Sequence, residues 1–515
     1  MIDKDFFYKK YKFYEKKKNS HGNLLFVDRE RIDTLFQLSI FSLALSNKFK
    51  LNTIILTDQK PNSMIINTYA KLGYNNFISG FSKKKIFLNP FLLLVSLYYF
   101  TASLIKIKIY GFNWLINKFD INDILIGDLI YDTNIRYEQR FINPKLDFYF
   151  LKVHFTSIFR FLIIQKYFKK FKIKKILIGT ETGSRNHGLT LRLGTKLRIK
   201  NYAYFRVSKN GVSIISYDKN YYKNGIDCIS LKKFNHISSK ISQKKVNNFY
   251  KNRIKFNTNN WYTMHDYEIS NQNSIKGYEF LKHLRKEKKK KFLFASHAFA
   301  DAPHAPGKFI FNDYYEQFTE TLKFAYKSNE NVIWIFKNHP NSRLYGEKKI
   351  FEDLIYKYKK DNIFLCPERV PVQDLLDVCD VVITGRGTIG IEFACLGKKV
   401  VTAGSSPYSK IAIAYEAKNK TSYFKYIDDI IKFQNFKKSK KIEINAKKLL
   451  YIFENSLNVQ TINMKDLSKD KKYKTFLNSI HTKNFKKNSI FLLFNKILQN
   501  GITNSEIYKK LIKII

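Results

Sequence analysis

Short apolar runs alternate with helical patterns between residues 292 and 404, and this alternation constrains the fold more than any other feature of the chain. Parallel strands need a crossover connection, which is usually a helix. The alternation therefore predicts a doubly wound parallel sheet covered by helices on both faces. The runs expected to be strands are residues 292–295, 332–336, 362–365, 381–384 and 400–404.

A looser version of the same pattern occupies the first half, where residues 23–28, 53–57, 76–79, 124–128 and 175–179 read as strands. A chain of 515 residues is too long for one hydrophobic core. The sequence therefore predicts an α/β protein of two Rossmann-like, doubly wound domains that face a cleft. The expected units are a first domain (1–240), a Lys-, Ser- and Asn-rich transition (241–291), a second domain (292–426) and a basic helical extension (427–515).

The formal net charge of +50 indicates either an acidic partner or a biased composition. The lysines are scattered along the whole chain, which favours the biased composition. No basic stripe interleaved with aromatics is visible, so nucleic acid is not an expected partner. An anionic inner membrane surface is expected to attract the chain. The four cysteines form no CxxC pair, and the N-terminus has no apolar signal segment. These features predict a cytoplasmic location.

Residues 91–105 form an apolar run that is shorter than the roughly 20 residues needed to span a bilayer. Pro90 precedes the run and lysines follow it, so we expect a helix. A buried helix and a helix lying on a membrane face are both open interpretations.

Ligands of open parallel sheets bind beyond the carboxyl ends of the strands, so the residues that follow each predicted strand are the candidates for function. Thr384 ends one strand, and Gly385, Arg386, Gly387 and Thr388 follow it. Glycines allow a close backbone approach, a helix start offers N–H groups to phosphate, and arginine can bind phosphate bidentately. Glu392, one helical turn later, could accept a hydrogen bond from a ribose or sugar hydroxyl. Alternatively, the glycines could form only a tight turn that starts a helix.

Two further strand ends carry histidines. The first is followed by Lys337, His339 and Pro340, and proline favours extended geometry in the residue before it. An imidazole held there could donate to a departing phosphate. The second strand end carries His297, Asp301 and His304, which we expect to contact donor or acceptor. No additional ligand cluster supports a metal site, so no metal is expected.

A reaction in which a hydroxyl group attacks an activated phosphate-linked group needs a carboxylate that takes the hydroxyl proton. The candidates in the first half are Asp128, Asp132 and Glu181. Glu181 lies between glycine-bearing turns, which suits a residue that projects into a cleft. Asp128 and Asp132 could instead cap helices.

Four stretches together resemble the family of capsule polysaccharide and surface carbohydrate biosynthesis proteins, which is similar to bacterial Kdo and polysialic acid transferases. They are IGDLIYDTNIR, HAFADAPHAPGKFIFNDYYEQF, KNHPNS and TGRGTIGIEFACLGKKVVTAGSSPYS. The resemblance implies a GT-B glycosyltransferase that needs no metal or cofactor. It places a nucleotide sugar at His339–Pro340 and at the turn from Thr384 to Glu392.

Arg386-Gly387-Thr388 stands where related enzymes often have serines, so CMP-, CDP- and UDP-linked donors all stay open. The implied acceptor is a growing polysaccharide or a lipid-linked sugar. Two other functions stay open as alternatives. One is a nucleotide-sugar 2-epimerase on the same architecture, and the other is a non-catalytic basic protein that binds nucleic acid.

Overall fold

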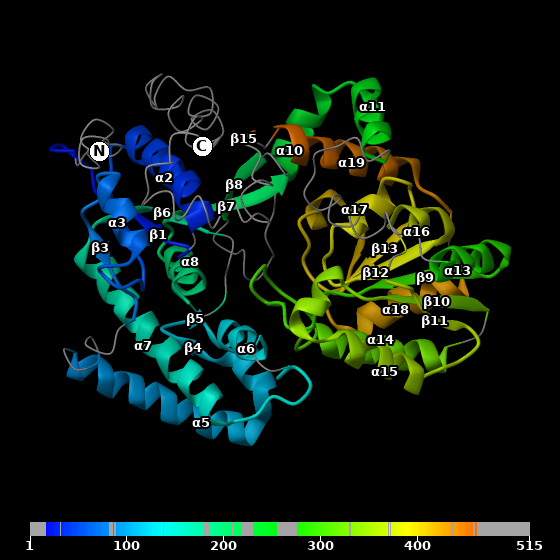
Figure 1. Cartoon of the computed structure of the whole chain (residues 1–515), viewed down its shortest axis with the longest axis horizontal. Coiled ribbons are helices and arrows are strands. Elements are labelled where there is room, and N and C mark those ends of the chain that lie inside the picture. The colour runs from blue at the N-terminus through cyan, green and yellow to red at the C-terminus, as the bar shows by residue number, and fades with distance from the viewer. Residues whose placement is uncertain are drawn as a thin grey trace, which may run out of the picture.

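The computed structural model describes residues 17–460 with gaps, the longest of which are 218–229 and 255–274. Shorter gaps fall at 31, 82–85, 87–88, 137–138, 180–182, 184, 209–210, 329–330, 369, 371, 434–436 and 457–458. The described part folds into two α/β domains that lie side by side (Figure 1). The expected extension beyond residue 460 lies outside the described residues.

The N-terminal domain contains a seven-stranded sheet with the order β15-β8-β7-β6-β1-β2-β3. Strands β3, β2, β1, β6 and β7 are parallel, and the order reverses between β1 and β6. Helices α2 (Ile32–Lys48), α3 (Met64–Lys71), α7 (Phe148–Lys170) and α8 (Asn186–Lys196) make the crossovers or cover the sheet. The parallel strands are β1 (Asn23–Val27), β2 (Asn52–Leu56), β3 (Phe77–Ile78), β6 (Ile173–Ile178) and β7 (Lys200–Ser208).

One predicted strand of this domain is wrong. Residues 124–128 do not enter the main sheet: β5 (Ile124–Leu125) forms a separate antiparallel pair with β4 (Asp120–Ile121), and α6 (Gly127–Ile135) starts immediately afterwards. A Cβ atom on Gly127 would lie 1.9 Å from the Leu115 carbonyl oxygen, so only glycine fits where α6 meets the preceding helix. Sequence analysis also missed β8 (Gly211–Tyr217), which pairs antiparallel with β7.

The C-terminal sheet has the order β11-β10-β9-β12-β13-β14, and all of its strand pairs are parallel. This is the Rossmann order, and it reverses between β9 and β12. The five strands expected here are all present. Their bounds are β9 (Lys290–Ala295), β10 (Val332–Lys337), β11 (Ile363–Leu365), β12 (Val381–Thr384) and β13 (Lys399–Thr402), with β14 (Tyr415–Glu416) added at the edge.

Alternate residues of β9 bury their side chains on opposite faces of this sheet, as the period of a strand requires. Phe292 and Phe294 join the core formed with α14 (Tyr314–Lys327), α15 (Lys348–Lys357) and α18 (Lys420–Lys432). Leu293 and Ala295 join the opposite core. That core includes α13 (Ile275–Lys286), α16 (Val372–Val378), α17 (Ile389–Ala394) and α19 (Lys440–Tyr451).

The segment expected to be a transition (241–291) contributes to the C-terminal domain, because Tyr250 of α11 (Gln243–Ile254) and Leu284 of α13 belong to its second core. Phe234 of α10 (Leu231–Ser239), which was expected in the first domain, belongs to the same core. After α19 the chain returns to the other domain, where β15 (Val459–Gln460) pairs antiparallel with β8. The two domains together form the GT-B arrangement that the sequence predicts.

Helix α5 (Pro90–Lys118) lies along the edge of the N-terminal domain against α7 and bends at Gly111, where φ is 73° (Figure 1). It extends well beyond the expected helix of residues 91–105. In the described part of the chain it is the one helix long and apolar enough to cross a membrane, and little of its apolar stretch is buried.

Candidate functional site

The strand order places two sets of loops at the points where function is expected. In the C-terminal domain, β9 and β12 flank the reversal, so the loops after β9, β10 and β12 meet at one edge of the sheet. In the N-terminal domain, the loops after β1 and β6 occupy the equivalent position.

His297 lies at the centre of the C-terminal loops. Its ring stacks on Tyr314 with centroids 4.4 Å apart, and it lies parallel to the ring of His339 at 6.1 Å. Its Nε2 accepts a hydrogen bond from the Arg386 backbone N–H at 3.3 Å. Three segments therefore meet at the His297 side chain: the loop after β9, the His339–Pro340 turn and the turn after β12.

The electrostatics of His297 favour the neutral form. Burial and, to a smaller extent, the neighbouring His339 lower the pKa of His297 to about 3. Because Nε2 accepts a hydrogen bond, the proton of the neutral ring lies on Nδ1. His339 is partly exposed, and its turn is fixed locally because its N–H donates to the Asn338 side chain at 2.8 Å.

The glycines of the turn after β12 are needed because neighbouring side chains approach the backbone closely. A Cβ atom on Gly385 would lie 2.7 Å from Tyr314 Cε1 and 2.9 Å from His297 Cδ2. One on Gly390 would lie 2.2 Å from the hydroxyl of Tyr408, which donates to the Gly387 carbonyl at 2.9 Å. These glycines pack the turn against His297 and Tyr408.

Several expected donor-binding residues of this region already have partners inside the protein. The buried Arg386 guanidinium donates to the Gly307 and Lys308 carbonyls and covers the Phe309 ring, while its Nε and Nη1 have no hydrogen-bond partner. The Lys337 amine donates to the Val370 carbonyl.

Thr384 accepts from the Gly387 N–H, and Thr388 precedes α17 without a side-chain cap. Glu392 lies half-buried within the short helix α17.

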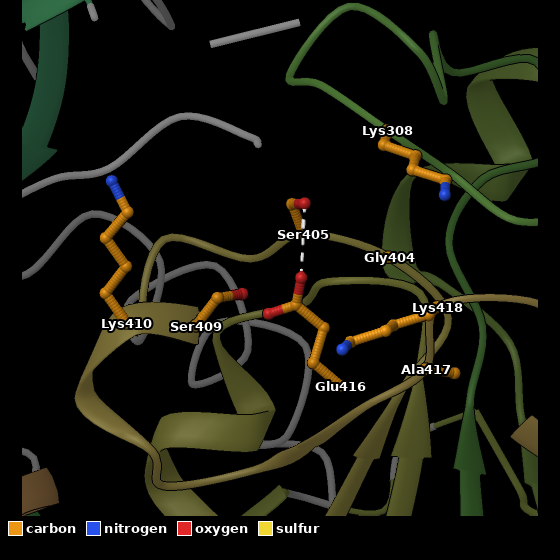
Figure 2. Close-up of a pocket in the computed structure, with 8 residues that line it drawn as sticks. All are labelled: Lys308, Gly404, Ser405, Ser409, Lys410, Glu416, Ala417 and Lys418. Atoms are coloured by element: carbon orange, nitrogen blue, oxygen red, sulfur yellow. Dashed lines mark hydrogen bonds between the residues drawn. The ribbon is translucent and has the colours of Figure 1, made fainter. Parts of the chain in front are cut away.

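A cavity of about 340 Å³ lies beyond the ends of β13 and β14 (Figure 2). At its centre the Ser405 hydroxyl donates to the Glu416 carboxylate at 3.2 Å, and the amine of Lys418 points toward that carboxylate. The loop after β9 closes one side through Lys308, whose carbonyl also contacts Arg386. The remaining lining residues are Gly404, Ser409, Lys410 and Ala417.

Sequence reasoning missed this cavity. The sequence signal for this cavity is the polar stretch after the strand that ends at Gly404. That stretch belongs to the family resemblance, but the sequence predicts no role for it.

The rest of the loop after β9 holds the two domains together. Asp132 of α6 is fully buried and accepts hydrogen bonds from the His304 N–H, the Ala305 N–H and His304 Nδ1, the last at 2.7 Å. Burial alone would lower the pKa of His304, but the Asp132 carboxylate raises it overall. Tyr131 donates to Asp313 across the same interface at 2.6 Å.

The three candidate bases therefore have different surroundings. Asp132 has both oxygens occupied at the interface, and Asp128 is buried against Arg192 at 2.6 Å. Burial raises the pKa of Asp128, although the Arg192 guanidinium opposes the shift. Glu181 lies outside the described residues. Asp301 is more exposed and pairs with Arg136 at 3.0 Å.

The N-terminal domain has its own cavity, of about 330 Å³, at the reversal between β1 and β6. Carboxylates and cations line it in nearly equal numbers, and α7 forms one wall. The charged lining residues are Asp28, Arg29, Glu30, Asp58, Lys152, Arg160 and Arg185. A pocket of this size with convergent polar groups is the usual form of a small-ligand site.

Local contacts fix the floor of this cavity. His187 Nδ1 accepts from the Gly179 N–H at 3.1 Å, so its protonated Nε2 donates to the Asp28 carbonyl at 2.9 Å and joins the loops after β6 and β1. The Asp28 carboxylate accepts from Tyr69 at 2.8 Å and Thr57 at 3.0 Å. Burial raises the pKa of Asp28 to about 6.

Glu30, two residues further on, adopts a left-handed backbone with φ 58°. This conformation is costly for a non-glycine residue.

In the described part of the chain, no three His, Cys, Asp or Glu side chains are grouped so that they could hold a metal ion. His297, Asp301 and His304 do not converge on one point, because they form hydrogen bonds with Arg386, Arg136 and Asp132, respectively.

The two Rossmann-like domains, with loops that converge at the strand reversal of one sheet and a charged cavity at that of the other, define a protein of the GT-B class. A model of the family described as "Capsule polysaccharide biosynthesis protein" matches residues 201–465, just over half of the sequence. The chain belongs to this family. The sequence-based prediction of a protein of capsule polysaccharide biosynthesis, with a glycosyltransferase fold, is confirmed at this level.

No curated protein matches the chain. Solved structures that overlap it include KpsC of Thermosulfurimonas dismutans, a beta Kdo 2,4 transferase, at 14% identity over 54% of this chain and 79% of that chain, with a TM-score of 0.30. UDP-GlcNAc 2-epimerase from Neisseria meningitidis, bound to UDP-GlcNAc, overlaps at 10% identity over 84% and 99%, with a TM-score of 0.27.

Anabaena Alr3699/HepE, in complex with UDP and glucose, overlaps at 11% identity over 84% and 95%, with a TM-score of 0.30. Overlaps this weak do not decide between transfer and epimerisation.

Replacing Asp132 and replacing Arg136 should show how much the buried Asp132–His304 pair and the exposed Arg136–Asp301 pair each contribute to stability. Asp132→Ala leaves His304 and two buried N–H groups without their acceptor, so we expect a loss of about 3–5 kcal/mol in the free energy of unfolding. Arg136→Ala removes the exposed pair with Asp301 and should cost less than about 1 kcal/mol. Urea unfolding of both variants checks this, and equal losses would contradict the assignment of Asp132 to the interface.

Proposed function

We propose that the chain is a cytoplasmic glycosyltransferase that moves a sugar from a nucleotide-activated donor to a growing surface polysaccharide or a lipid-linked acceptor. One observation carries the proposal: three loops at the reversal point of the C-terminal sheet gather on His297, while a charged cavity occupies the reversal point of the other sheet. Transfer between two substrates requires two such sites, and this chain has one in each domain.

The donor is assigned to the C-terminal loops. The partly exposed His339 can donate to a phosphate oxygen, and the amines of Lys308 and Lys418 add positive charge at the nearby cavity. Ser405, Glu416 and Glu392 offer oxygens to sugar or ribose hydroxyls. Fixed cations and donors stabilise a departing phosphate without a divalent ion, and CMP-, CDP- and UDP-linked sugars all suit this set.

The acceptor is assigned to the N-terminal cavity, where a carboxylate must take the proton of the attacking hydroxyl. Asp58 is paired with Arg160 at 3.0 Å, and Glu30 accepts the Asp58 N–H at 3.0 Å. Asp28 is also buried, and its oxygens accept from Tyr69 and Thr57, but unlike Asp132 it lines the cavity. Its pKa of about 6 suits a base near neutral pH. We therefore place Asp28 first among the described carboxylates, and Glu181 stays a candidate from the sequence.

Product analysis tests the function directly. Thermal shift against CMP, CDP, UDP and GDP first identifies the stabilising nucleotide, because a ligand that binds the native state raises its stability. The matching nucleotide sugars are then incubated with the protein in EDTA, with and without an oligosaccharide acceptor. We expect transfer that needs the acceptor and survives the chelator. An epimer formed from donor alone would instead identify an epimerase, and loss of transfer in EDTA would identify a metal requirement.

Replacing His339 should remove stabilisation of the leaving phosphate. We expect His339→Ala to lower kcat by about 10²–10³, the usual cost of losing one donor to developing charge. His236→Ala is the matched control, because His236 is exposed on α10 and outside both cavities. The proposal fails for His339 if both variants turn over at the wild-type rate while their unfolding midpoints are unchanged.

The pH dependence of transfer tests Asp28. The carboxylate acts as a base only when ionised, so kcat should fall as the pH drops below about 6. Asp28→Asn should lower kcat strongly and abolish this acidic limb, while Glu30→Gln should retain it. A pH profile of Asp28→Asn that parallels the wild type would remove Asp28 from the reaction and turn attention to Glu181.

A further inference from the structure

The outward face of α5 carries a stripe of large apolar side chains. Phe91, Leu94, Tyr98, Ile105 and Ile109 are each between 59% and 74% exposed, and they recur every three or four residues or at a multiple of that spacing. This spacing places them on one side of the helix. Leu97 and Tyr110 extend the same stripe, at 40% and 59% exposed. We call these seven residues the α5 stripe.

The inward face of the same helix carries polar groups. Ser96 and Ser103 are buried, and their hydroxyls donate to the Leu92 and Tyr99 carbonyls at 2.6 Å. Ser103 Oγ also lies 2.6 Å from Nε2 of the buried His154 on α7. A surface helix of a water-soluble domain normally buries its apolar stripe and exposes polar residues. Over this segment α5 buries two serines among its inner apolar contacts, while a second set of large apolar side chains stays outside.

The surroundings of the stripe favour a lipid surface. Lys106 and Lys108 are exposed beside it, and no acidic residue occurs anywhere between Pro90 and Lys118. Tyr98 and Tyr110 add aromatic rings with a polar end, which suit the boundary between lipid and water. With a net charge of +50 behind it, the stripe fits an anionic bilayer far better than a second, equally basic copy of the chain.

The packing of α5 argues for lying on the membrane rather than crossing it. Its inner side is fixed to α7 through Phe100 against His154 and through Phe112 against Phe150. Figure 1 shows the helix along the outer edge of the molecule, with α7 between it and the N-terminal sheet. A spanning helix would have to leave this core.

We propose that the α5 stripe docks the protein in the plane of an anionic membrane, with its apolar side chains in the acyl boundary and its lysines at the head groups. Helix α7 supports this arrangement, because its Lys152 and Arg160 line the N-terminal cavity while Phe150 and His154 contact α5. The cavity is therefore one helix away from the membrane surface. This position suits an acceptor that is anchored in lipid.

Vesicle sedimentation of the full chain tests the proposal. Phosphatidylcholine vesicles are compared with vesicles that also contain phosphatidylglycerol, at low salt and at about 0.5 M salt, where charge attraction alone is largely screened. The test variant is Phe91→Ser/Leu94→Ser/Ile105→Ser/Ile109→Ser, and these exposed positions should tolerate serine. The matched control is Leu197→Ser/Tyr278→Ser/Tyr356→Ser/Phe433→Ser, which removes four exposed apolar side chains from other helices and their ends.

We expect the wild type and the control to stay on the anionic vesicles at high salt, and the α5 variant to bind at least about tenfold more weakly. Equal binding by all three proteins would overturn the proposal. So would a wild-type dimer that the α5 variant converts to a monomer without any change in lipid binding, because the stripe would then be a subunit interface. Wild-type protein that resists carbonate extraction would show a spanning helix instead. The readout is binding alone, so it is independent of glycosyl transfer.

Discussion

The buried contact between Asp132 and His304 is the interaction on which the arrangement of the two domains depends. Each of the three donors around Asp132 belongs to the C-terminal domain, while the carboxylate itself stands on α6 of the other domain. The hydrophobic core follows the same path, because one continuous cluster includes Tyr131 and Phe141 on one side and Phe299 and Tyr314 on the other. The loop after β9 is therefore shared: one end holds His297 where the C-terminal loops converge, and the other end contacts the N-terminal domain.

This sharing explains why the sequence predicts which loops converge but not which of their side chains hold the two domains together. The strands of the C-terminal sheet were predictable because they are buried on both faces, and a strand of that kind has a continuous apolar run. Their parallel arrangement followed from the alternation with helices, so loops at the carboxyl ends of the strands could be expected to lie at one edge of the sheet. In contrast, Asp132 and His304 carry the residue types of an active site but serve the interface. Only the fold reveals which partner a side chain meets.

The N-terminal half was harder to read for local reasons. Residues 124–128 have the apolar composition of a buried strand, yet the chain enters α6 at Gly127, where the Leu115 carbonyl leaves no room for a side chain. The antiparallel strands β7 and β8 pair directly and need no crossover helix, so the alternation that marks the other strands is missing. Asp28 was overlooked because a single aspartate at the end of a strand carries no spacing signal, and its importance depends on Tyr69, Thr57 and the cavity around it.

The return of β15 to the N-terminal sheet has a mechanical consequence. The chain leaves the first domain after β8 and comes back beside that same strand, so both connections between the domains start from one edge of one sheet. Two tethers at a common edge restrict the ways in which the domains can separate and leave rotation about that edge as the easiest movement. The domains would then open by rotation about a hinge axis along β8 and β15. The contacts made by α6 on the opposite side would hold the domains closed.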